Sequence, residues 1–244
     1  MHMNANENVT GQVTTAPWVN KLVVFDTETT GVDVTSDRIV MATIALLDNG
    51  QVTTRYDWII NPGVPIPPGA TAVHKITDEI AQAQGMPPKD GIAEITETIA
   101  RALQSGYALV AFNASYDCSI LKAEAQRHGV TNFPELKPVI DPWIIDRFCD
   151  RYRRGKRTLS AVCAMHGVTL TNAHDSGSDA LAAGALVRAL AHIPDVLDHD
   201  VFIMHNKQIA WEEELTLSLK EYLRKNNLEF EHITPGWPTR LQVS

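Results

Sequence analysis

Four apolar residues in a row, at 22–25, predict a strand buried on both faces. Two acids, Asp26 and Glu28, follow it with one residue between them. Side chains at i and i+2 of an extended chain point to the same side, so both carboxylates should project together from the strand end. Adjacent carboxylates repel each other and lose solvation unless a cation joins them. The stretch therefore predicts a site for a divalent metal with oxygen ligands or, equally well, a solvated polar turn.

Two more strand-like runs follow, at 37–47 and 51–60. Asn49 and Gly50 lie between them, and this pair is a strong hairpin signal. The first three strands are therefore expected to form an antiparallel ribbon. Four prolines between residues 62 and 68 then predict an extended loop, after which Thr77 is expected to cap a short helix.

Strands and helices alternate in the middle of the chain. The pattern predicts a helix at 92–103, a strand at 107–112, a helix at 115–128, a short strand at 138–141, and helices at 159–166 and 178–191. This alternation indicates an α/β domain in which part of the sheet is parallel. Small residues in the last of these helices predict close packing on the sheet.

The C-terminal part of the chain has a different pattern. Apolar residues mark one face of an expected helix at Trp211, Leu215, Leu219 and Tyr222. Acids lie early and basic residues late in this helix, as the helix dipole prefers. The helix is interpreted either as an accessory element docked on the main domain or as a surface for self-association.

Charge and cysteine content narrow the function classes. A net charge of −8 argues against a tight, non-specific binder of nucleic acid, although bound metal would neutralise part of an acidic site. Six of the 21 basic residues lie at 147–157, which predicts either a phosphate contact or a solvated loop that balances nearby acids. Three cysteines without a CxxC pair argue against a disulfide framework and fit a reducing cytoplasm. No stretch is long enough to predict a membrane span.

Two later stretches place further acids where α/β proteins build active sites. Asp117 falls in the first turn of the helix that follows the strand at 107–112. Asp179 falls in the first turn of a later helix, five residues after His174. Strand ends and helix starts commonly form such sites. Each residue alone is weak evidence, because acids also favour helix N-termini and His174 fits an ordinary loop histidine.

Three motifs occur in one order: D-x-E-T-T-G from Asp26, N-A-x-x-D from Asn113, and H-x(4)-D from His174. Together they resemble the DEDDh exonucleases of the DnaQ-like 3′–5′ exonuclease superfamily, over about residues 20–191. Phe112 departs from the pattern, since many relatives have histidine there. The resemblance implies a ribonuclease-H-like α/β fold, in which a mixed sheet of an antiparallel ribbon and parallel strands is flanked by helices.

The same resemblance implies a set of site residues. Two Mg²⁺ or Mn²⁺ ions would be held by four acids, namely Asp26, Glu28, Asp117 and Asp179. Neutral His174 would take the proton of the attacking water. Four further residues are expected near the 3′-terminal nucleotide, namely Thr27, Thr29, His74 and Asn113. For the two threonines the alternative is turn stabilisation by their hydroxyls, and for His74 it is a structural role.

The function expected from the sequence is a metal-dependent 3′–5′ exonuclease that releases nucleoside 5′-monophosphates, preferentially from single-stranded DNA. The alternatives are an exoribonuclease, a proofreading or repair subunit that acts mainly through a polymerase partner, and a catalytically dead nucleic-acid-binding module. The oligomeric state is left open, with a homodimer joined through its helices as one option. The expected organisation is a flexible N-terminal tail at 1–19, an exonuclease domain at 20–193 and a helical accessory segment at 194–244.

Overall fold

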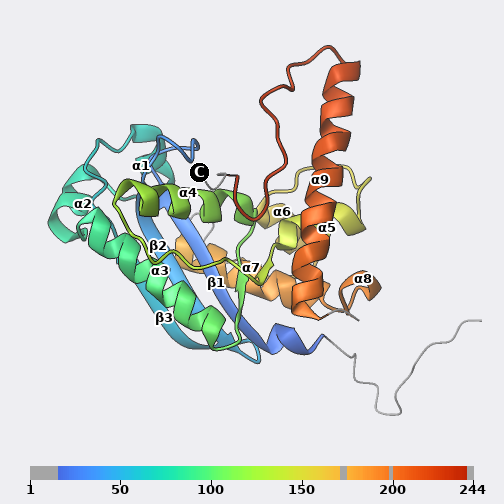
Figure 1. The fold of residues 1–244 in the computed structure, drawn as a ribbon, viewed down its shortest axis with the longest axis horizontal. Helices are drawn as coiled ribbons and strands as arrows, with labels where there is room; N and C mark the ends of the chain where they lie inside the picture. The colour runs from blue at the N-terminus through green and yellow to red at the C-terminus, as the bar shows by residue number, and fades with distance from the viewer. Residues whose placement is uncertain (1–15, 171–174, 198–199, 241–244) are drawn as a thin grey trace, which may run out of the picture.

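Five strands form one mixed sheet in the computed structural model, which describes residues 16–170, 175–197 and 200–240. The strands are β1 (Lys21–Thr29), β2 (Ile39–Asp48), β3 (Gln51–Ile59), β4 (Ala108–Val110) and β5 (Val139–Ile140). Their order across the sheet is β3-β2-β1-β4-β5. The first three strands pair antiparallel, whereas β4 and β5 extend the sheet in parallel from β1. This arrangement, flanked by helices, confirms the predicted fold class (Figure 1).

The hairpin between β2 and β3 turns where the sequence predicts it. Asn49 and Gly50 have φ angles of 52° and 82°. Both angles lie in the left-handed region that asparagine tolerates and glycine adopts freely. The two residues therefore set the antiparallel register that begins with Asp48 opposite Gln51.

Helices cover both faces of the sheet (Figure 1). On one face lie α3 (Pro88–Gln104) and α4 (Ala114–Arg127), and on the other α7 (Ser176–Leu190) packs against β1 and β2. A Cβ at Gly184 would lie only 2.7 Å from the Cγ1 of Val24, so a larger residue would push α7 away from β1. The predicted close packing of this helix is thus confirmed.

The segment around residues 62–80 differs in part from expectation. A short helix, α1 (Pro68–His74), replaces part of the predicted extended loop. The reason is that proline suits the first turn of a helix, where its missing N–H has no intrahelical partner to lose. The next helix, α2 (Asp78–Gln84), begins after Thr77, whose Oγ1 accepts a hydrogen bond from the Ile80 backbone N–H at 3.3 Å. This cap is as predicted.

Short helices complete the chain on the β5 side and at the N-terminal end. They are α5 (Pro142–Cys149), α6 (Leu159–Met165) and α8 (Pro194–Leu197), together with the 3₁₀ helix η1 (Pro17–Asn20). Val19 of η1, which belongs to the stretch expected to be a tail, is buried in the core. Residues 1–15 of that stretch lie outside the described part.

The longest helix, α9 (Val201–Lys225), covers the edge strand β5 and begins well before Trp211. His205 Nδ1 accepts from the Val139 N–H at 3.1 Å, and Gln208 Nε2 donates to the Val139 carbonyl at 3.1 Å. These side chains satisfy backbone groups that an edge strand would otherwise leave unpaired. The C-terminal helix is therefore joined to the sheet by buried hydrogen bonds.

The apolar face predicted for this helix is buried only in its first half. Trp211 and Leu215 are 7% exposed, and Trp211 stacks on Phe148 with ring centres 4.5 Å apart. Leu219 and Tyr222 are 38% and 61% exposed, because this end of α9 projects beyond the sheet (Figure 1). Among the described residues, no helix combines the length and the apolar character needed to cross a membrane.

Candidate active site

Three of the predicted acids meet at the end of β1. Asp26 and Glu28 come from β1, and Asp179 comes from the first turn of α7. Each offers a carboxylate oxygen, and these oxygens lie within 4.8 Å of one another. The spacing of two along the strand and the packing of α7 on β1 bring the three groups to one point. They form what is called here the acidic cluster.

The start of α7 is fixed to the sheet by buried hydroxyl groups. Ser176 Oγ shares a 2.8 Å hydrogen bond with Thr43 Oγ1. Thr43 lies on β2 directly opposite Asp26 in the β1–β2 ladder. Asp175 caps the helix, because its carboxylate accepts from the Ser178 N–H at 3.0 Å. These contacts hold Asp179 over the end of β1.

Asp117 lies beside the acidic cluster and is held by β1 itself. Its Oδ1 accepts from the Thr27 backbone N–H at 3.1 Å and from the Thr27 hydroxyl at 2.7 Å. Both side chains are buried. The Thr27 hydroxyl was predicted to contact the nucleotide, but it donates its hydrogen bond to Asp117. This contact is closer to the alternative prediction, in which the hydroxyl stabilises the local structure.

Burial and mutual repulsion raise the pKa values of these acids. Burial first, and then the charges of Asp117, Glu28 and Asp179, hold the pKa of Asp26 well above its usual range. Burial and then Asp179 raise the pKa of Glu28 to about 7, and burial raises that of Asp117 to about 7. A nearby cation would offset both the burial and the mutual repulsion of the carboxylates. Carboxylate oxygens are also the ligands that Mg²⁺ and Mn²⁺ prefer. The residues present thus fit a hard divalent cation.

Metal binding is expected to weaken as the pH falls from 8 to 6. Glu28 and Asp117 have pKa values of about 7, so at pH 6 each carboxyl group must lose a proton before it can bind a cation. Each such proton costs about 1.4 kcal/mol per pH unit below the pKa, so the Kd for Mn²⁺ should rise about 10-fold or more. Isothermal titration in two buffers of different ionisation enthalpy would measure both the Kd and the protons released. A Kd that does not change with pH would contradict this assignment.

Thr29 and His74 lie together near the end of β1. The Thr29 hydroxyl donates to the Gly31 carbonyl at 2.7 Å and lies 2.6 Å from the Tyr116 hydroxyl. These contacts stabilise the turn after β1, which was the alternative to a substrate role. His74 is buried, and its Nδ1 accepts from the Ile76 N–H at 3.1 Å. Burial lowers the His74 pKa, and the Thr29 backbone partly opposes this effect.

The start of α4 reveals a residue that the motif did not single out. Asn113 precedes α4 with φ 62°, and its N–H donates to Asp141 Oδ1 at 3.0 Å. The buried Asp141 also accepts from the N–H groups of Ala114 at 2.8 Å and Trp143 at 2.9 Å, so it ties α4 to α5. Burial raises the pKa of Asp141 to about 6. An Asp directly before Pro142, a residue that suits the first turn of a helix, was a usable N-cap signal.

His174, the predicted general base, lies outside the described residues. Its place relative to the acidic cluster stays a prediction. The described chain resumes at Asp175, which adds to the repulsion that raises the pKa values of Asp26 and Glu28.

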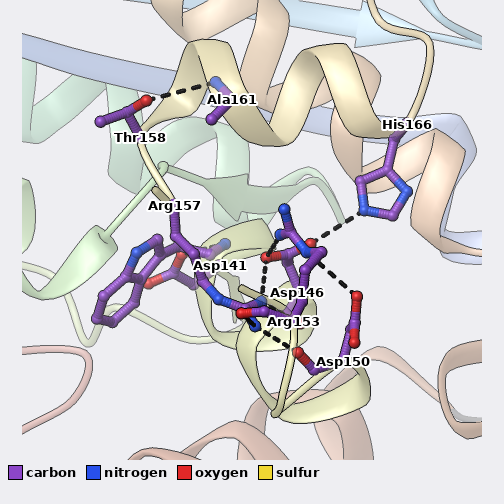
Figure 2. A network of polar contacts seen from close by, with 9 residues as sticks. Asp141, Asp146, Asp150, Arg153, Arg157, Thr158, Ala161 and His166 are labelled. Atoms are coloured by element: carbon purple, nitrogen blue, oxygen red, sulfur yellow. Dashed lines mark hydrogen bonds and ion pairs between the residues drawn. The ribbon is translucent and has the colours of Figure 1, made fainter. Parts of the chain in front are cut away.

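Three of the six basic residues at 147–157 form ion pairs within the described part of the chain. Arg153 and Arg157 both reach the buried Asp146, and the Arg157 Nη1 lies 2.7 Å from its Oδ2. Figure 2 shows these guanidinium groups around Asp146 and His166 on its other side, 3.0 Å away. The phosphate contact is therefore not supported for Arg153 and Arg157, and neutralising Arg153 would disturb Asp146 rather than report on a substrate.

Replacing Asp146 with alanine is expected to destabilise the fold by about 3–5 kcal/mol, because it leaves Arg157 partly buried without a counter-charge and leaves Arg153 with only the exposed Asp150. Urea denaturation measures this change. Glu214→Ala is the matched control, since it breaks the more exposed pair with Arg151 and should cost less than about 1 kcal/mol. Equal losses in the two variants would show that the Asp146 network contributes no more than a surface pair.

A family model described as an exonuclease matches residues 23–187. The chain belongs to this exonuclease family. The resemblance to DnaQ-like exonucleases is thus confirmed at the level of the family. The matched range begins inside β1 and ends within α7, so it contains the acidic cluster, Asp117 and His174.

Curated relatives of this exonuclease-family chain are much longer proteins. It is 28% identical over 167 residues to the DNA polymerase III PolC-type of Pediococcus pentosaceus, covering 68% of this chain and 11% of the relative. It is 25% identical over 255 residues to the DNA polymerase III PolC-type of Caldanaerobacter subterraneus, covering 96% of this chain and 17% of the relative. The chain therefore spans less than a fifth of the length of these polymerases.

Solved structures share the fold at low sequence identity. The crystal structure of E. coli exonuclease I in complex with a dA16 oligonucleotide matches with a TM-score of 0.61 and 19% identity, covering 73% of this chain and 42% of that one. Exonuclease X in complex with 5′ overhanging duplex DNA matches with a TM-score of 0.55 and 19% identity, covering 75% and 99%. At these identities the matches establish the fold alone.

Proposed function

We propose that this chain is a metal-dependent 3′–5′ exonuclease that hydrolyses single-stranded DNA to nucleoside 5′-monophosphates. The observation that carries the proposal is the acidic cluster, whose three carboxylates lie within 4.8 Å of one another inside an exonuclease-family fold. Asp117 lies next to this cluster and contributes to the repulsion on Asp26. Such a concentration of raised-pKa acids suits a site that holds divalent cations.

The positions of the four acids support a role for each of them. Asp26, Glu28 and Asp179 would hold two Mg²⁺ or Mn²⁺ ions, and Asp117, fixed by Thr27, would complete the ligand set through a water. When bound, the ions would stabilise charge at the phosphate and lower the pKa of a water. His174 would then act as general base and take the proton of the attacking water. The 3′ oxygen of the remaining strand would leave as the terminal nucleotide is released.

A structural neighbour supports the proposed preference for single-stranded DNA. Exonuclease I, which shares this fold, has been crystallised with dT13 and dA16 oligonucleotides. An RNA substrate is the alternative. The choice between DNA and RNA is thus part of the test.

A second candidate function is that of a subunit or module that works with a polymerase. One observation favours this second function: the curated relatives of the chain are DNA polymerases of the PolC type. The exposed end of α9, with Leu219 and Tyr222, would then be the surface that contacts the polymerase. On this proposal the isolated chain would be less active than the chain with its polymerase.

The deciding experiment uses matched single strands of DNA and RNA, each labelled at the 5′ end. The chain is incubated with each strand in Mn²⁺ or in EDTA. A metal-dependent ladder that shortens from the 3′ end would support the proposal, and the faster of the two strands would identify the sugar. Cleavage inside the strand, or shortening from the 5′ end, would overturn it. No cleavage until a polymerase is added would favour the second candidate.

A further inference from the structure

A cavity of about 350 Å³ lies on the other side of the first turn of α4 from Thr27. It is enclosed by α4, α5, α9 and the C-terminal residues 232–240. Its volume lies within the range of small-ligand sites, which is about 300–1,000 Å³. The residues that matter for its chemistry are Ser115, Trp143, Arg147, Glu212, Thr234 and Arg240. None of the predicted site residues lines this cavity.

Arg147 gives the cavity a cationic, planar surface. Its guanidinium carbon lies 4.4 Å from the centre of the Trp143 ring, so the two planar groups are stacked. Among the residues that the structure describes, it forms no ion pair. Burial and then the charge of Arg157 lower the pKa of Arg147, and Glu212 partly opposes them. Burial and Arg157 both disfavour the charged form of Arg147, and an anion in the cavity would stabilise it.

Glu212, the acid in the lining, is engaged elsewhere. Its Oε1 accepts from the Thr216 hydroxyl at 2.8 Å, and its Oε2 accepts from the Gly236 N–H at 3.2 Å. The bond from Gly236 fixes the C-terminal residues against α9. A second cation, Arg240, and the hydroxyl groups of Ser115 and Thr234 also line the cavity. The free polar groups are thus mainly donors, next to an aromatic ring.

We propose that this cavity binds one nucleotide unit of a single-stranded nucleic acid. The phosphate would bind Arg147, and the base would stack on the Trp143–Arg147 pair, as bases do on aromatic rings and guanidinium planes. This inference rests on the proposed function, because it makes the cavity a subsite for the strand whose 3′ end lies at the acidic cluster. Ser115 lines the cavity and Asp117 lies beside the acidic cluster, and both belong to one turn of α4. The strand would therefore have to cross the width of one helix between the cavity and the acidic cluster, which takes roughly three nucleotides.

The test separates the cavity from the acidic cluster by substrate length. Binding of a 5′-labelled dT8 strand is measured by fluorescence anisotropy with the Asp26→Ala variant, alone and combined with Arg147→Met. Methionine keeps the apolar stem but removes the charge and the plane. The Kd for dT8 should rise about 10-fold, as expected for the loss of one stacked base and one phosphate contact.

Two further variants keep the measurement interpretable. Arg101→Met makes the same change in charge on α3, where Arg101 is exposed and paired with Glu97, and should change the Kd less than two-fold. Arg240→Met removes the second, exposed cation of the cavity and should raise the Kd about three-fold even if Arg147→Met fails to fold. Melting temperatures of all variants report folding.

The proposed function is checked separately with the p-nitrophenyl ester of thymidine 5′-monophosphate, which is too short to reach the cavity. Equal turnover of this ester by the unmodified chain and by Arg147→Met, with weaker dT8 binding, supports the subsite. No turnover by the unmodified chain would count against the proposed function, and dT8 binding would still decide the subsite. If the Kd for dT8 is unchanged in both Arg147→Met and Arg240→Met, the inference is overturned. If an acidic peptide binds instead, and its binding depends on Arg147, the cavity is a site for a protein segment.

Discussion

Replacing Asp26 with alanine is expected to reduce metal-dependent hydrolysis of an oligonucleotide by about 10³-fold or more. We expect this loss because Asp26 is repelled by Asp117, Glu28 and Asp179, which makes it the proposed central ligand of the site. Metal ions at such sites contribute several kcal/mol of transition-state stabilisation, and each 1.4 kcal/mol is a factor of ten in rate. Single-turnover cleavage of a 5′-labelled strand at saturating Mn²⁺ measures the effect.

The control for this substitution is Asp90→Ala. Asp90 is an exposed acid in the first turn of α3, so its loss makes the same chemical change away from the acidic cluster. It should leave the rate within about two-fold of the unmodified chain, as surface substitutions usually do. Asp26→Ala should also melt at a higher temperature than the unmodified chain in EDTA, because it removes one of several mutually repelling charges. Full activity in Asp26→Ala would refute the two-metal assignment.

Replacing His174 with alanine is expected to slow the chemical step by about 10²–10⁴-fold, which is the usual contribution of a general base. Substrate binding should change little, so kcat should fall while KM stays nearly constant. A base must be unprotonated, and an ordinary imidazole titrates near ~6.5. Activity of the unmodified chain should therefore fall as the pH drops below that value at saturating metal.

The pH profile distinguishes this role from a structural one. In His174→Ala the residual rate should lose the acid limb that the imidazole causes and keep only the dependence that arises from metal binding. His192→Ala is a suitable control, because His192 is exposed just after α7 and has no assigned role. A parallel loss of substrate affinity and rate in His174→Ala would show that the histidine holds the substrate rather than a proton.

Much of the sheet could be predicted from local sequence. The apolar run before Asp26, the Asn49–Gly50 turn and the small residues of α7 each have one favourable structural outcome, and each was found in the expected place. Local rules succeed here because side-chain spacing and backbone freedom decide these features within a few residues.

The elements that were missed depend on distant parts of the chain. Prolines that suggested a loop begin α1, because a helix start and an extended loop tolerate the same residue. The basic segment at 147–157 left open a phosphate contact and a loop that balances nearby acids. Arg153 and Arg157 do balance an acid, but this acid lies on α5 and its burial is not evident from the sequence. Asp141 ties α4 to α5, and only the paired helix starts show this role.

The sequence by itself determined the acids, their order and the family that carries them. Spacing of two along β1 places Asp26 and Glu28 on one side, whatever surrounds them. Only the tertiary structure decided that Asp179 joins them within 4.8 Å, while Asp117 is held beside them by Thr27. It also decided that α9 closes the sheet edge through His205 and Gln208. The physical reason is that backbone rules act over a few residues, whereas burial and the pairing of charges depend on which distant segments pack together.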